Sequence, residues 1–287
     1  ARAHIALADR AARHLQHAVE RLLGGHAQRL VHFDAGTEVA QREVTPRFLK
    51  VTHSHKADGS LFTEADAATQ AALEAALPAI SDVPVLGEEM TEQQQHDAWD
   101  AGRDGLWCVD PIDGTSNFVA GVPYFAVSVA YLYKGERQLG VIYDPIADEM
   151  FSAERGKGAH LNATPLPLRA PATELRRALA GVELKRIDRE LAGRLASWPP
   201  YASQRNFGAS TLDWCYTAAG RFDIYVHGGQ KLWDYAAGAL ILEEAGGRMR
   251  CLGGNFDTAS PWERSVVASA SPALFELWRD WLKAAGA

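Results

Sequence analysis

The chain has 287 residues, of which 47% are hydrophobic and 23% are charged, so it can bury a substantial core as one large domain or two moderate ones. Its net charge of −7, without a long lysine or arginine run, excludes an evident nucleic-acid footprint, and we expect no nucleic-acid partner. No apolar stretch approaches the ~20 residues that span a bilayer, and the start of the chain lacks a signal-peptide pattern, so we expect no membrane partner and a cytoplasmic location.

The first part of the chain carries mainly helical patterns. Apolar residues at a spacing near 3.6 predict an amphipathic helix over 3–24, ended by Gly24 and Gly25. The mixed polarity of 26–50 predicts partly helical structure, and turn residues predict a loop over 56–60. A further helix is expected from Thr63 to Pro78.

The middle of the chain carries strand patterns. Short apolar runs predict strands over 83–86 and 106–109, the second stopped by Pro111, with a polar, solvated excursion over 91–104 between them. Three strands within 124–155, separated by turns, predict an antiparallel meander.

After residue 160 strands and helices alternate. The pattern predicts strands over 178–182, 222–226 and 266–269, and helices over 189–198, 208–219, 234–245 and 272–285. This mixture indicates a layered α+β or α/β fold. The cysteines, Cys108, Cys215 and Cys251, lack CxxC spacing, so we expect small buried side chains in a reduced compartment.

Four acids follow apolar runs or begin a helical pattern, where side chains face a crevice. They are Glu88, Asp110, Asp113 and Asp234. Four carboxylates share a pocket only where protons or cations offset their charge. Oxygen ligands suit hard divalent cations, Mg²⁺ above all, so we expect metal-assisted chemistry on an anionic substrate.

Each acid also has a simpler structural interpretation. Asp113 before Gly114 is typical of a turn, and Asp234 is placed to cap a helix. Asp66 lies in Thr63–Asp66, which resembles a capping box, but it could instead orient Thr115. One aspartate could do both, so that alternative stays open.

Other catalytic sites find no support. His53 and His55 have no further ligand at zinc-site spacing. No G-x-S-x-G elbow and no GxxxxGK[ST] loop occurs in the chain, which leaves a serine nucleophile and a P-loop without their motifs.

Four segments together resemble the inositol monophosphatase-like, Mg²⁺-dependent, lithium-sensitive phosphatases. They are Lys56–Asp66 (KADGSLFTEAD), Gly87–Glu89, Trp107–Phe118 (WCVDPIDGTSNF) and Trp233–Gly247 (WDYAAGALILEEAGG). The resemblance implies a layered α-β-α-β-α sugar-phosphatase-type fold, with an antiparallel sheet in the N-terminal half and a mixed sheet in the C-terminal half. It further implies one domain over 1–287, whose halves meet at the active site with a boundary near residue 160, and a homodimer.

The same resemblance implies the roles of individual residues. Two to three Mg²⁺ ions are expected, held by Glu88, Asp110, the carbonyl of Ile112, Asp113 and Asp234. Thr115, supported by Asp66, is expected to position the attacking water, and Glu88 is expected to serve catalysis by helping to bind a weaker third metal ion. Substrate contacts are expected from Asp113, Gly114, Thr115, Gly208, Ala209, His227 and Asp234, with the amides of Gly114 and Thr115 on the phosphate.

The expected substrate is a small phosphate monoester. Seven residues before Asp234, inositol-selective members of the family carry a glutamate, and this chain has His227, which presents no fixed anion to a polyol. Inositol 1-phosphate remains the leading expectation. Histidinol phosphate is the alternative, followed by fructose 1,6-bisphosphate and 3′-phosphoadenosine 5′-phosphate. A regulatory binding protein with the same fold is the alternative of a different class.

Overall fold

The computed structural model describes residues 39–50, 53–55 and 61–286. The helix expected over 3–24 and the loop expected over 56–60 lie outside the described residues. Of the segment 26–50, the described part is helical, as a π-helical turn at Ala40–Val44 and a 3₁₀ turn at Thr45–Arg47.

The larger sheet has seven strands in the order β3-β4-β5-β6-β7-β8-β9. Its strands are β3 (Val85–Gly87), β4 (Leu106–Asp113), β5 (Ala126–Tyr133), β6 (Glu136–Asp144), β7 (Glu149–Glu154), β8 (Gly158–Leu161) and β9 (Thr164–Pro165). The β3–β4 pair is parallel and all the others are antiparallel, so the expected meander of β5, β6 and β7 is confirmed.

The smaller sheet has five strands in the order β11-β10-β12-β14-β13. They are β10 (Leu179–Glu183), β11 (Ser203–Arg205), β12 (Ile224–Gln230), β13 (Arg248–Arg250) and β14 (Arg264–Ser269). β10 pairs in parallel with β11 and β12, whereas β14 pairs antiparallel with β12 and β13, which confirms the mixed sheet. A separate antiparallel pair joins β1 (His53–His55) and β2 (Leu61–Thr63).

The α-helices are α3 (Glu64–Ala76), α4 (Glu92–Ala101), α5 (Thr115–Ala120), α6 (Arg189–Ser197), α7 (Ser210–Ala218), α8 (Leu232–Glu244) and α9 (Pro272–Ala284). Short 3₁₀ turns lie at Leu77–Ala79, Gly102–Asp104 and Leu175–Arg177. None of the described helices combines the length and the apolar character needed to cross a membrane.

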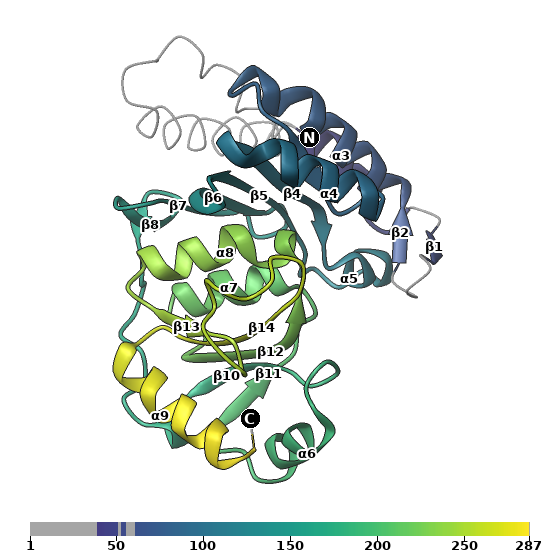
Figure 1. Cartoon of the computed structure of the whole chain (residues 1–287). Coiled ribbons are helices and arrows are strands. Elements are labelled where there is room, and N and C mark those ends of the chain that lie inside the picture. Colours follow the sequence, from purple (N-terminus) through teal and green to yellow (C-terminus); the bar gives the residue numbers. More distant parts are fainter. Residues whose placement is uncertain (1–38, 51–52, 56–60, 287) are drawn as a thin grey trace.

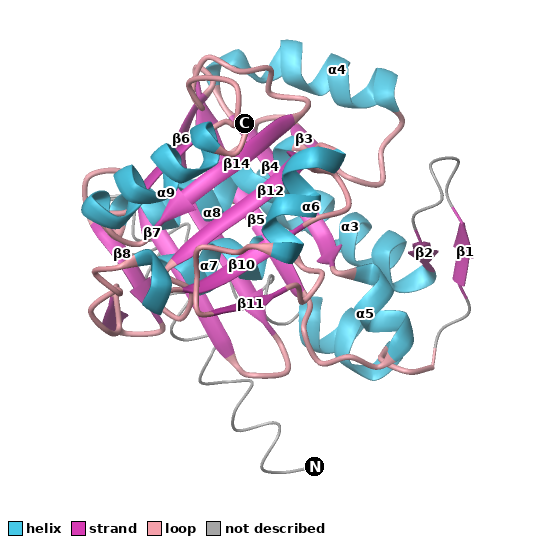
Figure 2. Ribbon diagram, turned by 90° about the horizontal axis from the view of Figure 1, so that it is seen from below, coloured by secondary structure: helices cyan, strands magenta, loops and turns pink. Residues whose placement is uncertain are grey.

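These elements form five layers, as Figure 1 shows: α3 and α4, the larger sheet, α7 and α8, the smaller sheet, and finally α6 and α9. Figure 2 shows that the strands of the two sheets run in different directions. Three buried apolar clusters fill the spaces between the layers, and the largest surrounds α7 and α8. Because α7 and α8 pack against both sheets, we infer that the two halves form one folding unit.

The structure differs from the sequence-based expectation at two places near the site. The polar segment 91–104 contains the helix α4, which begins with the capping box of Thr91 and Gln94 and lacks an extended apolar face. Pro111 does not end its strand, because β4 continues to Asp113 across a register shift against β5. The three cysteines are buried and free, as expected.

Candidate metal centre

The irregular end of β4 delivers two acids to one cavity. The pairing of β4 with β5 shifts register between Asp110 and Asp113, so the strand is not regular between these two residues. The N–H of Ile112 donates to Asp110 Oδ1 at 3.1 Å, and the N–H and hydroxyl of Thr211 each donate to Asp113 Oδ2 at 2.6 Å. Both carboxylates are therefore oriented by donors that the fold supplies.

The third acid comes from the first turn of α8. The N–H of Lys231 donates to Asp234 Oδ2 at 2.8 Å, so this aspartate does cap the helix, from its third position rather than as its N-cap. One carboxylate oxygen from each of Asp110, Asp113 and Asp234 lies within 4.8 Å of the others. Residues 121 positions apart in the sequence are thus brought together (234 − 113 = 121).

This crowding disfavours ionisation of the acids. Burial is the largest cause of a raised pKa at all three, placing the pKa of Asp113 at about 6 and that of Asp234 at about 8, while the pKa of Asp110 lies well above its usual range. Neighbouring carboxylates, including Glu88, raise these pKa values further, whereas the bonds from Thr211 oppose the shift at Asp113. Bound cations would offset this repulsion.

Glu88 completes the group and shares a hydrogen bond with Asp110. Two glutamines hold the loop that carries it. Gln70 of α3 accepts from the N–H of Glu89 at 2.9 Å, and the side-chain amide of Gln95, on α4, donates to the carbonyl oxygens of Gly87, Glu88 and Met90 at 3.1 to 3.2 Å. A Cβ on Gly87 would lie 2.4 Å from Gln70 Oε1, so a larger residue here would displace the Gln70 amide.

Thr115 and Asp66 meet at the beginning of α5. The Thr115 hydroxyl lies 3.3 Å from Asp66 Oδ1 and 3.1 Å from the carbonyl oxygen of Ile112. The other oxygen of Asp66 accepts from the N–H of Thr63 at 2.8 Å and from its hydroxyl at 2.5 Å. Asp66 therefore caps α3 and contacts Thr115 at once.

The acids line a cavity of about 380 Å³. Its lining residues are Leu61, Glu88, Asp110, Ile112, Asp113, Gly114, Thr115, Ser116, Arg186, Gly208, Gly229, Gln230, Lys231, Trp233, Asp234 and Glu263. Most of the residues expected to bind metal or substrate are thus brought together.

Two expected substrate contacts, Ala209 and His227, are absent from that lining. Ala209 is fully buried just before α7. His227 is 5% exposed, and its Nδ1 accepts from the N–H of Gly229 at 3.2 Å. Burial, with the nearby charge of Arg186, lowers the pKa of His227 to about 3, so the imidazole is neutral near neutral pH.

Several functional side chains were not anticipated from the sequence. Gln95 and Thr211 orient acids or their loop, and Arg186, Lys231 and Glu263 line the cavity. The capping signal at Thr91 could have revealed α4, and with it Gln95. The other four follow from tertiary contacts, for which the sequence offers no local signal.

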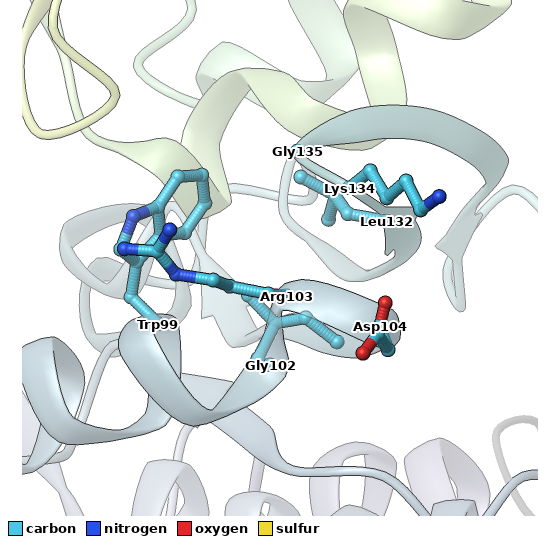
Figure 3. Close-up of a pocket in the computed structure, with 8 residues that line it drawn as sticks. Trp99, Gly102, Arg103, Asp104, Leu132, Lys134 and Gly135 are labelled. Atoms are coloured by element: carbon cyan, nitrogen blue, oxygen red, sulfur yellow. The ribbon is translucent and has the colours of Figure 1, made fainter.

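A second cavity, of about 430 Å³, lies between the end of α4 and the β5–β6 turn. Figure 3 shows Arg103 extending toward Trp99, while the side chains of Asp104 and Lys134 point elsewhere. The charged groups of this cavity do not converge on one point, so it is a weaker candidate for a reaction site.

The carboxylate cavity fits a hard divalent cation. Its donors are oxygens, three of them within 4.8 Å of one another, and burial together with neighbouring carboxylates raises the pKa values of these acids. Mg²⁺ prefers such donors, and a carboxylate-rich site matches it better than zinc, which favours nitrogen and sulfur ligands.

Comparisons with known proteins agree with this geometry. The model of the inositol monophosphatase family matches residues 25–283. A curated relative named Nus factor SuhB, from Pasteurella multocida, is 38% identical over 190 residues, which cover 63% of this chain and 67% of that protein. The chain spans 56 to 67% of the length of the first four such relatives.

Solved structures resemble the whole fold. Extragenic suppressor protein suhB from Bartonella henselae has a TM-score of 0.72 at 29% identity, covering 93% of this chain and 98% of that one. SaIMPase-II bound to inositol monophosphate has a TM-score of 0.71 at 26% identity, covering 92% and 95%. An IMPase/NADP phosphatase complexed with Mg²⁺ and phosphate has a TM-score of 0.74 at 25% identity, covering 87% and 94%.

Proposed function

The chain belongs to the inositol monophosphatase family, and we propose that it is a Mg²⁺-dependent phosphomonoesterase. The observation that carries this proposal is the convergence of Asp110, Asp113 and Asp234 within 4.8 Å, with Glu88 hydrogen-bonded to Asp110. The related phosphatase that binds Mg²⁺ and phosphate supports the choice of metal.

We assign two to three Mg²⁺ ions to this cavity, held by Glu88, Asp110, the carbonyl of Ile112, Asp113 and Asp234. When bound, such ions activate water, polarise phosphoryl oxygens and neutralise the leaving alkoxide. The chain itself supplies positioning, which is most of what phosphoryl transfer asks of a protein.

Thr115 is the residue proposed to orient the attacking water. Its hydroxyl is held between Asp66 and the carbonyl of Ile112, both of which can accept its proton, so its free lone pair can accept from water. The amides of Gly114 and Thr115, at the cavity lining, are proposed to bind the phosphate.

The proposed substrate is a small phosphate monoester, with inositol 1-phosphate as the first choice. The bound inositol monophosphate in SaIMPase-II supports that choice. Histidinol phosphate, fructose 1,6-bisphosphate and 3′-phosphoadenosine 5′-phosphate are the remaining candidates. A homodimeric assembly and a cytoplasmic location are also part of the proposal.

The proposal is tested by measuring phosphate release from these four compounds. We expect release with Mg²⁺ from at least one of them and none with a chelator. Release that persists in chelator would overturn the metal dependence, and no release from any of them with Mg²⁺ would remove these four substrates.

A second candidate function is a regulatory binding role. The name Nus factor SuhB on the curated relatives favours it, and that name conflicts with the expectation that the chain has no nucleic-acid partner. Binding to a purified partner that is unchanged in Asp110→Asn would support this role, since it needs no metal carboxylate.

A further inference from the structure

The turn that follows β10 projects a cation over the cavity. Glu183 accepts the backbone N–H groups of Lys185 at 2.7 Å and of Arg186 at 3.0 Å, which fixes the turn. A Cβ at Gly228 would lie 1.9 Å from the carbonyl oxygen of Arg186, so β12 approaches the turn this closely only because that position is glycine. The position of Arg186 at the cavity is therefore built into the fold.

The guanidinium of Arg186 keeps donors available for a ligand. Its contact with Glu183 is 4.0 Å long, beyond hydrogen-bonding distance, and its side chain is 56% exposed. Its charge still reaches the metal carboxylates, because it lowers the pKa of Asp234 against the larger effect of burial. Lys231, an exposed residue three positions before Asp234, lines the same cavity.

The position that would hold a polyol-binding acid is neutral instead. His227 is buried, lies outside the lining and carries no charge near neutral pH. A polyol would thus find no carboxylate there to accept its hydroxyl hydrogens, whereas an anion would find two cations at the rim of the cavity.

From this geometry we infer that Arg186 and Lys231 form a second anion subsite. This subsite favours a phosphate monoester with a further carboxylate or phosphate away from the scissile group over inositol 1-phosphate, the first choice above. The inference rests on the proposed function and names its substrate class. The fork of a guanidinium matches carboxylate and phosphate oxygens, and an ammonium adds a point charge.

Glu263 offers the rival interpretation. Its Oε1 lies 3.1 Å from an ideal Cβ on Gly229, and Arg186 Cδ lies 3.9 Å from the same point, so the two side chains share one part of the rim. An amino-alcohol phosphate would place its ammonium on Glu263. Whether the substrate carries a remote negative or positive charge therefore distinguishes the two interpretations.

The test compares three small esters that differ in remote charge: 3-phosphoglycerate, glycerol 3-phosphate and phosphoethanolamine. Phosphate release with Mg²⁺ is measured for the parent, Arg186→Gln, Lys231→Gln and the matched control Arg189→Gln, a residue of α6 outside the lining. We expect the parent to prefer 3-phosphoglycerate in kcat/KM. Each rim variant should raise KM for that ester about tenfold or more, and change KM for glycerol 3-phosphate less than about threefold, by loss of a charge-assisted bond.

Two results would refute the proposed subsite. One is an equal change in KM for all three esters in Arg186→Gln. The other is a parent preference for phosphoethanolamine that is lost in Glu263→Gln. If the parent hydrolyses none of them, the phosphatase proposal has failed for this class. In that case the subsite is tested by measuring, by calorimetry, the binding of 3-phosphoglycerate and glycerol 3-phosphate to the Mg²⁺-loaded protein. Weaker binding of 3-phosphoglycerate in Arg186→Gln, with binding of glycerol 3-phosphate unchanged, would support the subsite. Unchanged binding of both would refute it.

Discussion

The carboxylate end of the cavity and its rim differ in how firmly the fold holds their side chains. Asp110 and Asp113 are buried or half-buried and accept donors from neighbouring backbone, whereas Arg186, Lys231 and Glu263 are exposed. In the proposed function, the reaction class is thus tied to the buried layers of the fold. The proposed substrate choice depends instead on a few surface side chains that can change without disturbing those layers.

The largest expected effect comes from breaking the carboxylate end. Asp110→Asn removes a proposed metal ligand, and we expect at least about a hundredfold loss of phosphate release, on the order of 3 kcal/mol of transition-state stabilisation. Asp280→Asn, at an exposed position on α9, is the matched control. Activity of Asp110→Asn within about threefold of the parent would refute the assignment.

The loop that carries Glu88, at the carboxylate end, is tested by substituting Gln95. Gln95→Ala removes the donor to three carbonyl oxygens around Glu88, so we expect Mg²⁺ affinity, measured by calorimetry, to fall about tenfold. Gln93→Ala, which loses only a bond to Asp97 on the outer side of α4, should leave that affinity unchanged. Equal affinities in the two variants would show that the loop holds its shape without Gln95.

The charge of the buried end predicts a pH effect on stability. The pKa values of Asp113, about 6, and Asp234, about 8, lie above the ordinary carboxyl range, so the folded metal-free chain binds more protons than the unfolded chain between about pH 4 and about pH 8. The free energy of unfolding therefore falls as pH rises through that window.

In chelator we expect Tm to drop by about 4 °C or more between about pH 5.5 and pH 8. Added Mg²⁺ should restore more of the Tm at the higher pH, because ligation needs ionised carboxylates. A Tm that rises with pH in chelator would contradict the shared burial of these acids.

The smallest effect is expected at His227, which is buried outside the cavity lining. Because its side chain is outside the cavity lining, His227→Gln should leave the ratio of activities on inositol 1-phosphate and histidinol phosphate within about twofold. His227→Glu would bury a carboxylate and is expected to lower Tm instead of shifting that ratio. A large change of ratio in His227→Gln would place the imidazole on the substrate.

The sequence predicted the buried end better than the rim. Asp110 and Asp113 follow an apolar run and Asp234 begins a helical pattern, and the layered packing brings the three acids together. The role of Gln95 was not predicted, because the polar residues of 91–104 gave no apolar pattern that indicates the helix α4. This helix begins with a capping box and has no apolar stripe.

The prediction that Pro111 ends its strand was wrong. A proline has no N–H for the sheet ladder and normally ends a strand, but the irregular pairing after Asp110 accommodates it without a lost bond in the regular ladder. The position of Arg186 could not be predicted at all, because it depends on contact between Gly228 and a turn that lies 42 residues earlier in the chain (228 − 186 = 42).

Asp66 divides its two oxygens between different tasks: one caps the start of α3 and the other contacts Thr115. Removing this side chain would destabilise the start of α3 and free the Thr115 hydroxyl at the same time. An inactive Asp66 variant could therefore not distinguish misfolding from a misplaced Thr115. A Thr115→Val variant keeps the helix start and isolates the chemical task. The shared carboxylate also means that a solvent condition that unwinds the start of α3 would release the Thr115 hydroxyl as well.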